Sequence, residues 1–192
     1  QLRSGRTTYA LRGDAQPLVQ IDSADVLAPI LAQRGIVLST GERLAQIRSG
    51  AGELAVSVGG TVDLDGEAGL VEEISGLVEA PHGILGNFDP DYLRLPEDIL
   101  TTVMRIHQRY LPVRAEDGGL LPHFITFANG ACDETAVRAG NENVLRARYE
   151  DAAFFYDADL KVPLADFRAD IAKLTFENRL GSMAKRADRI RD

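Results

Sequence analysis

The first half of the chain is dominated by apolar positions that recur every three or four residues. This spacing places apolar side chains on one face of a helix. The pattern predicts helices at residues 23–34, from residue 40 onward and at 67–78. It also predicts a short strand at residues 36–38. Ser23 and Thr40 carry side chains suited to helix N-termini. Gly50 and Gly52 are expected to weaken or end the second helix, because glycine is a poor helix former.

The middle of the chain has a different texture, with short apolar runs separated by glycine and proline. It predicts strands at residues 83–88, 110–113 and 122–128. It also predicts a helix at residues 97–108. The Glu116–Gly119 turn between the last two strands is typical of a hairpin. The rest of the chain is helical again, with breaks expected at Gly140 and Pro163 and final helices at 164–174 and 177–190.

These elements predict an α+β fold, in which helices pack on a small, mostly antiparallel sheet and a helical C-terminal arm follows. We expect an irregular segment at 1–20, an α+β domain at 21–160 and a helical arm at 161–192 that leads to a next domain. The chain starts without Met, so we interpret it as a piece of a longer polypeptide. No signal peptide or apolar run of roughly 20 residues is visible, so no membrane contact is expected.

The stretch from residue 140 to 156 has an unusual helical wheel. One face collects the apolar side chains Val144, Leu145, Tyr149, Ala152, Phe155 and Tyr156. Asn141 and Arg148 fall in the middle of that face. Burying an unpaired arginine would cost several kcal/mol. Arg148 therefore either forms a buried ion pair, with Asp151 as a possible partner, or binds an anionic ligand.

The net charge of −8 excludes a general DNA or RNA binder, because such proteins are usually basic enough to neutralise phosphates. Contact with RNA would need a local basic patch. Two patches are candidates, one at the start and one at the end of the chain: Arg3, Arg6 and Arg12, and Arg179, Lys185, Arg186, Arg189 and Arg191. Each is otherwise a solvated surface or linker.

Residues that carry catalysis form no recognisable constellation along the sequence. The single Cys132 excludes an intrachain disulfide and fits a reducing, cytoplasmic setting. His82, His107 and His123 are scattered, and none stands at metal-ligand spacing from another ligand. The chain has no phosphate-binding glycine loop and no Gly-x-Ser-x-Gly elbow. We therefore predict no catalytic, metal or cofactor site in this chain.

The Met104–Tyr110 segment is the most interesting candidate for RNA contact. It combines Arg105, Gln108 and Arg109 with an aromatic residue where the predicted helix leads into a strand. Arginine can hold a phosphate through two hydrogen bonds, and aromatic rings can stack on bases. The alternative is that its apolar and aromatic side chains belong to the core.

Several phrases of the sequence, taken in order, resemble the β subunit of bacterial heterotetrameric glycyl-tRNA synthetase. The phrases lie at residues 70–81, 104–113, 118–125, 140–144, 151–155 and 180–182. Arg105 and Arg109 stand where the family usually has lysine, and Gly119 also replaces a lysine. The resemblance covers almost the whole chain and places it before the HD-like domain of that subunit.

The resemblance implies a part of a class II glycine–tRNA ligase, an α2β2 enzyme. In that family the α subunit makes glycyl-adenylate from glycine and ATP with Mg²⁺, and the β subunit supplies tRNA recognition. It also implies a B3/B4-like fold, a type that edits in the phenylalanyl enzyme. The expected partners are accordingly the α subunit and glycine tRNA, and no DNA.

Three functions remain open. The first is a non-catalytic domain that holds tRNA or organises the β subunit. The second is a hydrolytic editing module, and the third is a scaffold that meets the α subunit or the rest of β. For direct tRNA contact the candidate residues are Arg105, Gln108, Arg109, Arg146 and Arg148. Arg146 is expected on the exposed face of its helix, one turn from Glu150.

Overall fold

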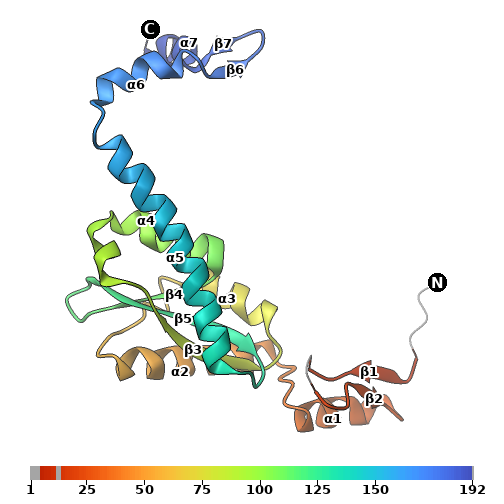
Figure 1. The fold of residues 1–192 in the computed structure, drawn as a ribbon. Coiled ribbons are helices and arrows are strands. Elements are labelled where there is room, and N and C mark those ends of the chain that lie inside the picture. The colour runs from red at the N-terminus through yellow and green to blue at the C-terminus, as the bar shows by residue number, and fades with distance from the viewer. Residues whose placement is uncertain (1–4, 12–13, 192) are drawn as a thin grey trace. The chain divides into compact units, whose positions relative to one another are not determined.

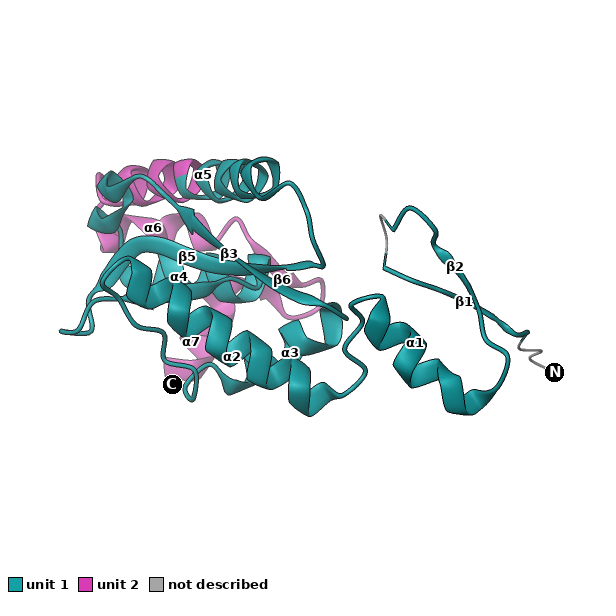
Figure 2. Cartoon of the chain, turned by 90° about the horizontal axis from the view of Figure 1, so that it is seen from below, with its two compact units in different colours: residues 1–149 teal, residues 150–192 magenta. Residues whose placement is uncertain are grey.

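The structure, a computed structural model, describes residues 5–11 and 14–191 (Figure 1). The chain forms two compact units, residues 1–149 and 150–192, and the boundary falls within one long helix (Figure 2). The class is α+β, as the hydrophobic pattern predicts. Within the described ranges, no helix has both the length and the apolar character needed to cross a membrane.

The first unit begins with a small hairpin, where the sequence pattern predicts irregular chain. Strands β1 (Thr7–Tyr9) and β2 (Leu18–Gln20) pair antiparallel. The predicted first helix forms as a 3-10 turn η1 (Ala24–Val26) that continues into α1 (Leu27–Gln33). The strand predicted at 36–38 is wrong: this segment has no ladder and is held by single contacts, such as Val37 N donating to the oxygen of Glu79 at 2.7 Å.

Helix α2 (Thr40–Ser57) continues through both glycines that were expected to weaken or end it. Its N-cap is Ser39, whose hydroxyl accepts a hydrogen bond from Glu42 N at 3.3 Å. One face of the helix is fully buried at Ile47, Ala51 and Ala55. Burial of this face outweighs the roughly 1 kcal/mol that a glycine costs within a helix, so tertiary packing decides the length of α2.

The centre of the first unit is a three-stranded antiparallel sheet with strand order β3-β5-β4. Its strands are β3 (Pro81–Asn87), β4 (Leu111–Arg114) and β5 (Leu120–Asn129). The predicted hairpin between the last two is confirmed: Gly118 adopts φ +89° and Asp117 accepts a hydrogen bond from Gly119 N at 3.0 Å. Positive φ favours glycine because a Cβ is strained there.

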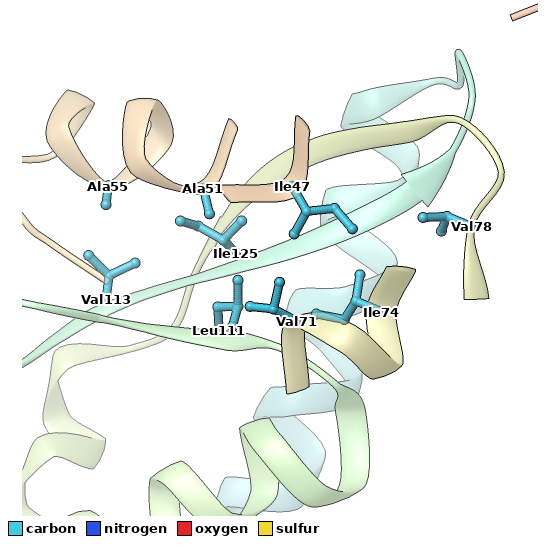
Figure 3. Packing of buried hydrophobic residues seen from close by; sticks show 9 residues of the cluster. All are labelled: Ile47, Ala51, Ala55, Val71, Ile74, Val78, Leu111, Val113 and Ile125. Atoms are coloured by element: carbon cyan, nitrogen blue, oxygen red, sulfur yellow. The ribbon is translucent and has the colours of Figure 1, made fainter. Parts of the chain in front are cut away.

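Helices α2 and α3 (Ala68–Leu77) cover one side of the sheet, and the first part of α5 (Glu134–Asp159) lies on the other (Figure 2). The core between the sheet and α2 and α3 is apolar (Figure 3). Its buried members are Ile47, Ala51, Ala55, Val71, Ile74, Val78, Leu111, Val113 and Ile125. The alternation of inward and outward residues along the strands produces this layer.

An aromatic layer fills the other side of the sheet. The rings of Tyr110 and Phe124 stack with centroids 4.5 Å apart, and Phe88 meets Tyr149 edge-to-face at 5.2 Å. A Cβ on Gly86 would lie 2.2 Å from Phe124 Cζ, so only glycine fits beneath that ring. The elements beside this layer are the 3-10 helix η2 (Pro90–Arg94), helix α4 (Glu97–Thr102) and the π-helix η3 (Val103–Gln108).

Helix α5 runs without a break through Gly140, contrary to the prediction. Its buried stripe is centred on Leu145 and Tyr149, both fully inaccessible, with Asn141 half-buried. Arg148 is exposed, so the buried ion pair, one of the two alternatives for this residue, does not form. Successive helical residues are about 100° apart. The stripe is rotated toward Tyr149, which leaves Arg148 and Phe155, 63% exposed, outside it.

The second unit starts within α5 and holds α6 (Leu164–Ile171) and α7 (Met183–Arg191). The predicted break at Pro163 is confirmed, since this residue occupies the N-cap of α6. A helix predicted from residue 177 is wrong in its first part. Strands β6 (Thr175–Glu177) and β7 (Gly181–Ser182) form a hairpin there, and Gly181 adopts φ +82°.

Candidate nucleic-acid interface

The three candidate residues of the 104–110 segment lie on and just after the π-helix η3. Arg105 forms an ion pair with Glu67 at the start of α3, and the Glu67 side chain is only 10% exposed. Arg109 ends η3 in the left-handed conformation, at φ +58°. Its Nε lies 2.8 Å from Glu73 Oε1, and its Nη1 donates to the oxygen of Ile106 at 2.6 Å. Gln108 is half-buried.

Through these contacts Arg105 and Arg109 stabilise the fold. The π-helix has carbonyls at its end without helical partners, and Arg109 returns to satisfy them. Both guanidinium groups also connect η3 to carboxylates of α3. A phosphate could recruit Arg105 only by leaving the carboxylate of Glu67 unpaired in a largely buried position, which is unfavourable.

The other two candidates, Arg146 and Arg148, are both exposed on α5. Residues two positions apart on a helix differ by about 200° of rotation about the helix axis. The two arginines therefore flank the buried stripe of Leu145 and Tyr149 on opposite sides and do not face one phosphate. The five predicted residues thus do not all face one phosphate.

A network of hydrogen bonds that the sequence did not reveal joins α5 to the ends of β3 and β5. Glu142 Oε1 accepts hydrogen bonds from Asn87 N at 2.9 Å and from Asn87 Nδ2 at 3.4 Å. Asn87 Oδ1 lies 2.6 Å from His123 Nδ1. Because the Asn87 amide nitrogen faces the carboxylate, its oxygen faces the imidazole, and Nδ1 of His123 is the protonated nitrogen. Burial lowers the pKa of His123 below its ordinary value, which favours the neutral ring.

The Gly-Asn-Glu sequence at residues 140–142 explains how this hydrogen-bond network is positioned. Asn141 Oδ1 accepts a hydrogen bond from the Tyr110 hydroxyl at 2.7 Å, and its neighbour Glu142 meets Asn87. Burial raises the pKa of Tyr110 to about 12, so its hydroxyl stays protonated at neutral pH. The phrase was a signal for these contacts, but only the fold supplies partners 31 and 55 residues away. Its evident role is to fix α5 on the sheet.

Further pairings connect distant parts of the first unit. His82 Nε2 lies 2.8 Å from Glu134 Oε1, a partner 52 residues away. Cys132 is exposed. Across residues 5–11 and 14–191, no three His, Cys, Asp or Glu side chains gather as metal ligands.

Basic residues concentrate at the end of the chain. Residues 1–149 contain 13 Lys and Arg against 20 Asp and Glu, whereas residues 175–191 contain five against two. The five are Arg179, Lys185, Arg186, Arg189 and Arg191. Of the candidate patch near the start, Arg6 is exposed, while Arg3 and Arg12 lie outside the described residues. The chain therefore combines an acidic first unit with a locally basic end.

Comparison with known proteins places this geometry in context. A family model described as "Glycyl-tRNA synthetase beta subunit" matches residues 1–192. The chain is 40% identical over 191 residues to a "Glycine--tRNA ligase beta subunit" of Desulfitobacterium hafniense, covering 99% of this chain and 27% of that protein. A "Glycine--tRNA ligase, chloroplastic/mitochondrial 2" of Arabidopsis thaliana is 38% identical, covering 99% of this chain and 18% of that protein.

A "Glycine--tRNA ligase beta subunit" of Magnetococcus marinus is 42% identical over 161 residues, which cover 83% of this chain and 23% of that protein. The chain thus spans about a quarter of the length of the bacterial relatives that it matches.

Proposed function

Because the chain belongs to the glycyl-tRNA synthetase β subunit family, we propose that it is a non-catalytic β-subunit domain that supports recognition of glycine tRNA. The observation that carries this proposal is the family match over residues 1–192. The reaction that it serves is the ligation of glycine to tRNA at the expense of ATP. Adenylate formation takes place on an α subunit, with Mg²⁺, and this domain contributes to the tRNA-dependent step.

The charge distribution supports a local contact with tRNA. An acidic surface repels a polyanion, so the 20 acidic and 13 basic residues of the first unit disfavour wrapping of RNA around it. Arg146 and Arg148 are exposed on α5, where each can contact a single phosphate. Arg105 and Arg109 contribute indirectly, because they hold η3 against α3.

Binding of glycine tRNA by the 192-residue chain tests this function. We expect binding that is tighter than to an unrelated tRNA and that weakens steeply between 50 and 200 mM salt, as phosphate contacts require. Equal affinity for both tRNAs would contradict recognition. A folded chain that binds no tRNA at low salt would contradict direct tRNA contact altogether.

Single variants then separate the two sides of α5. In an enzyme assembled from the α and β subunits, Arg148→Gln and Arg146→Gln are each expected to raise the KM for tRNA without changing ATP–pyrophosphate exchange. The matched control is Arg48→Gln, which also removes one positive charge, here from a half-exposed side chain that pairs with Asp65 at 3.0 Å. An equal rise in KM in the control would indicate a general effect of charge and no site on α5.

A second candidate function is assembly, and the exposed apolar side chains of the second unit favour it. The side chains of Leu164, Ile190, Phe154, Leu160 and Phe155 are 87, 76, 69, 68 and 63% exposed. Apolar groups gathered on so small a unit are typical of surfaces that another protein covers. Capture of the α subunit by the chain would support this role, and its loss in a Leu160→Ser/Leu164→Ser variant would locate the contact.

A further inference from the structure

The hairpin β6–β7 and helix α7 carry a positive charge that the rest of the chain does not share. Both acidic side chains of residues 175–191 already have partners. Glu177 Oε2 accepts hydrogen bonds from Arg179 N at 2.8 Å and from Leu180 N at 3.0 Å. Asp188 Oδ1 lies 3.1 Å from Arg168 Nη2 and 3.4 Å from Arg191 Nη2. With five basic residues against these two acids, the segment keeps a net positive charge.

Helix α7 separates its charged residues into two faces. Ala184, Ala187, Asp188 and Arg191 line a cavity of about 270 Å³ together with Arg168 and Ile171 of α6. At about 100° per residue, Lys185, Arg186 and Arg189 fall within a third of a turn of one another, on the opposite side of the helix. All three are exposed or half-exposed. The inner face thus holds α6, and the outer face presents three cations.

Two of these cations are held in position. The guanidinium carbon of Arg186 lies 4.3 Å from the centroid of the Phe176 ring on β6. Arg189 donates one hydrogen bond, to the oxygen of Leu180 at 3.0 Å, which leaves its other donors for a ligand. A guanidinium stacked on a ring keeps its N–H edges free, and such edges match the oxygens of a phosphate. Arg179 adds a fourth exposed cation from the turn of the hairpin.

We propose that these four residues, Arg179, Lys185, Arg186 and Arg189, form a binding surface for the phosphate backbone of RNA. The inference rests on the proposed function, because it makes tRNA the occupant and locates the contact on the second unit. Three of the four cations are arginines, and one is fixed on an aromatic ring. This composition fits phosphate oxygens better than it fits scattered carboxylates, since arginine binds phosphate through two parallel hydrogen bonds.

Salt-dependent binding of a labelled glycine tRNA transcript by the 192-residue chain tests the surface. The variant Lys185→Gln/Arg186→Gln/Arg189→Gln removes three cations from exposed helical positions and keeps good helix formers. Each lost phosphate contact lowers the slope of log K against log salt by about 0.7–0.9. We expect the slope to fall by about two to three units and the affinity at 100 mM salt to fall by about ten-fold or more.

The matched control is Arg48→Gln/Lys161→Gln/Lys173→Gln, which removes the same charge outside the surface, from one half-exposed position and two exposed ones. It is expected to keep the slope of the unmodified chain. The conservative Arg186→Lys is expected to weaken binding at an unchanged slope, since the charge stays while the stacked guanidinium is lost. Far-UV circular dichroism verifies that α7 is formed in each variant.

Three results would overturn the inference. Equal slopes for the triple variant and the control, while the unmodified chain binds tRNA, would refute this surface and leave the proposed function intact. Failure of the unmodified chain to bind tRNA would refute both. Unchanged tRNA affinity with loss of α-subunit capture in the triple variant would assign the cations to a protein contact.

Discussion

The ion pair between Arg105 and Glu67 decides whether the 104–110 segment serves the fold or the RNA. The perturbation is Arg105→Gln, which leaves the carboxylate of Glu67, 10% exposed, without its charged partner. Removing one partner of a fully buried pair costs about 3–5 kcal/mol, whereas an exposed pair contributes about 0–1 kcal/mol. Arg105 is 39% exposed, so water reaches part of this pair. We expect an intermediate loss of about 2 kcal/mol in the free energy of unfolding.

Urea unfolding measures this loss. With a slope of about 2 kcal/mol per molar urea, the midpoint of the first unit should fall by about 1 M. The near-ultraviolet signal of the tyrosines follows this unit, since Tyr110 and Tyr149 are buried there. A Glu67→Gln/Arg105→Gln variant should be more stable than Arg105→Gln alone, because no unpaired charge is left.

The tRNA affinity of the same variant completes the test. Under native conditions, Arg105→Gln should bind tRNA as the unmodified chain does, since its role is to hold η3 against α3. An unchanged urea midpoint together with weaker tRNA binding would refute the structural assignment. Arg105 would then be a phosphate ligand, as the sequence first suggested.

Three other changes have distinct expected signs. Gly86→Ala should destabilise the chain by about 1–3 kcal/mol in urea unfolding, because the new methyl group meets the buried ring of Phe124; an unchanged midpoint would show that the ring can move aside. Gly140→Ala should stabilise it by about 0.5–1 kcal/mol, since the site lies inside α5 and no atom beyond the local helix backbone lies within 4 Å of the added Cβ; a loss of stability would contradict that open space. Because the pKa of His123 is lowered in the folded chain, the unfolded chain takes up the proton first as pH falls below the ordinary value of 6.5. Stability should therefore decrease as the pH falls through this window, and it should decrease less in His123→Gln. Urea midpoints at pH 5 and pH 7 would measure this. An equal change in midpoint between the two pH values in both proteins would contradict burial of the ring.

The sequence by itself determined the class of the fold and the family. Apolar spacing located α2, α3 and the strands of the sheet, because burial of one face forces a period of 3.6 or of 2 on the chain. Local chemistry fixed the hairpin at Gly118, where only a positive φ closes the turn. The phrases of the sequence identified the family, and the comparisons agree.

Only the tertiary structure decided which face of α5 is buried and what the arginines do. A helical wheel gives the angles between side chains but not which direction faces the core. Packing of Tyr149 against Leu100 and Phe88 centres the buried stripe on Tyr149 and leaves Arg148 exposed to solvent. Arg105 and Arg109 looked free because their partners on α3 are far away in sequence. Contacts such as Arg109 to Glu73, 36 residues apart, depend on long-range packing, and no local pattern encodes such pairs.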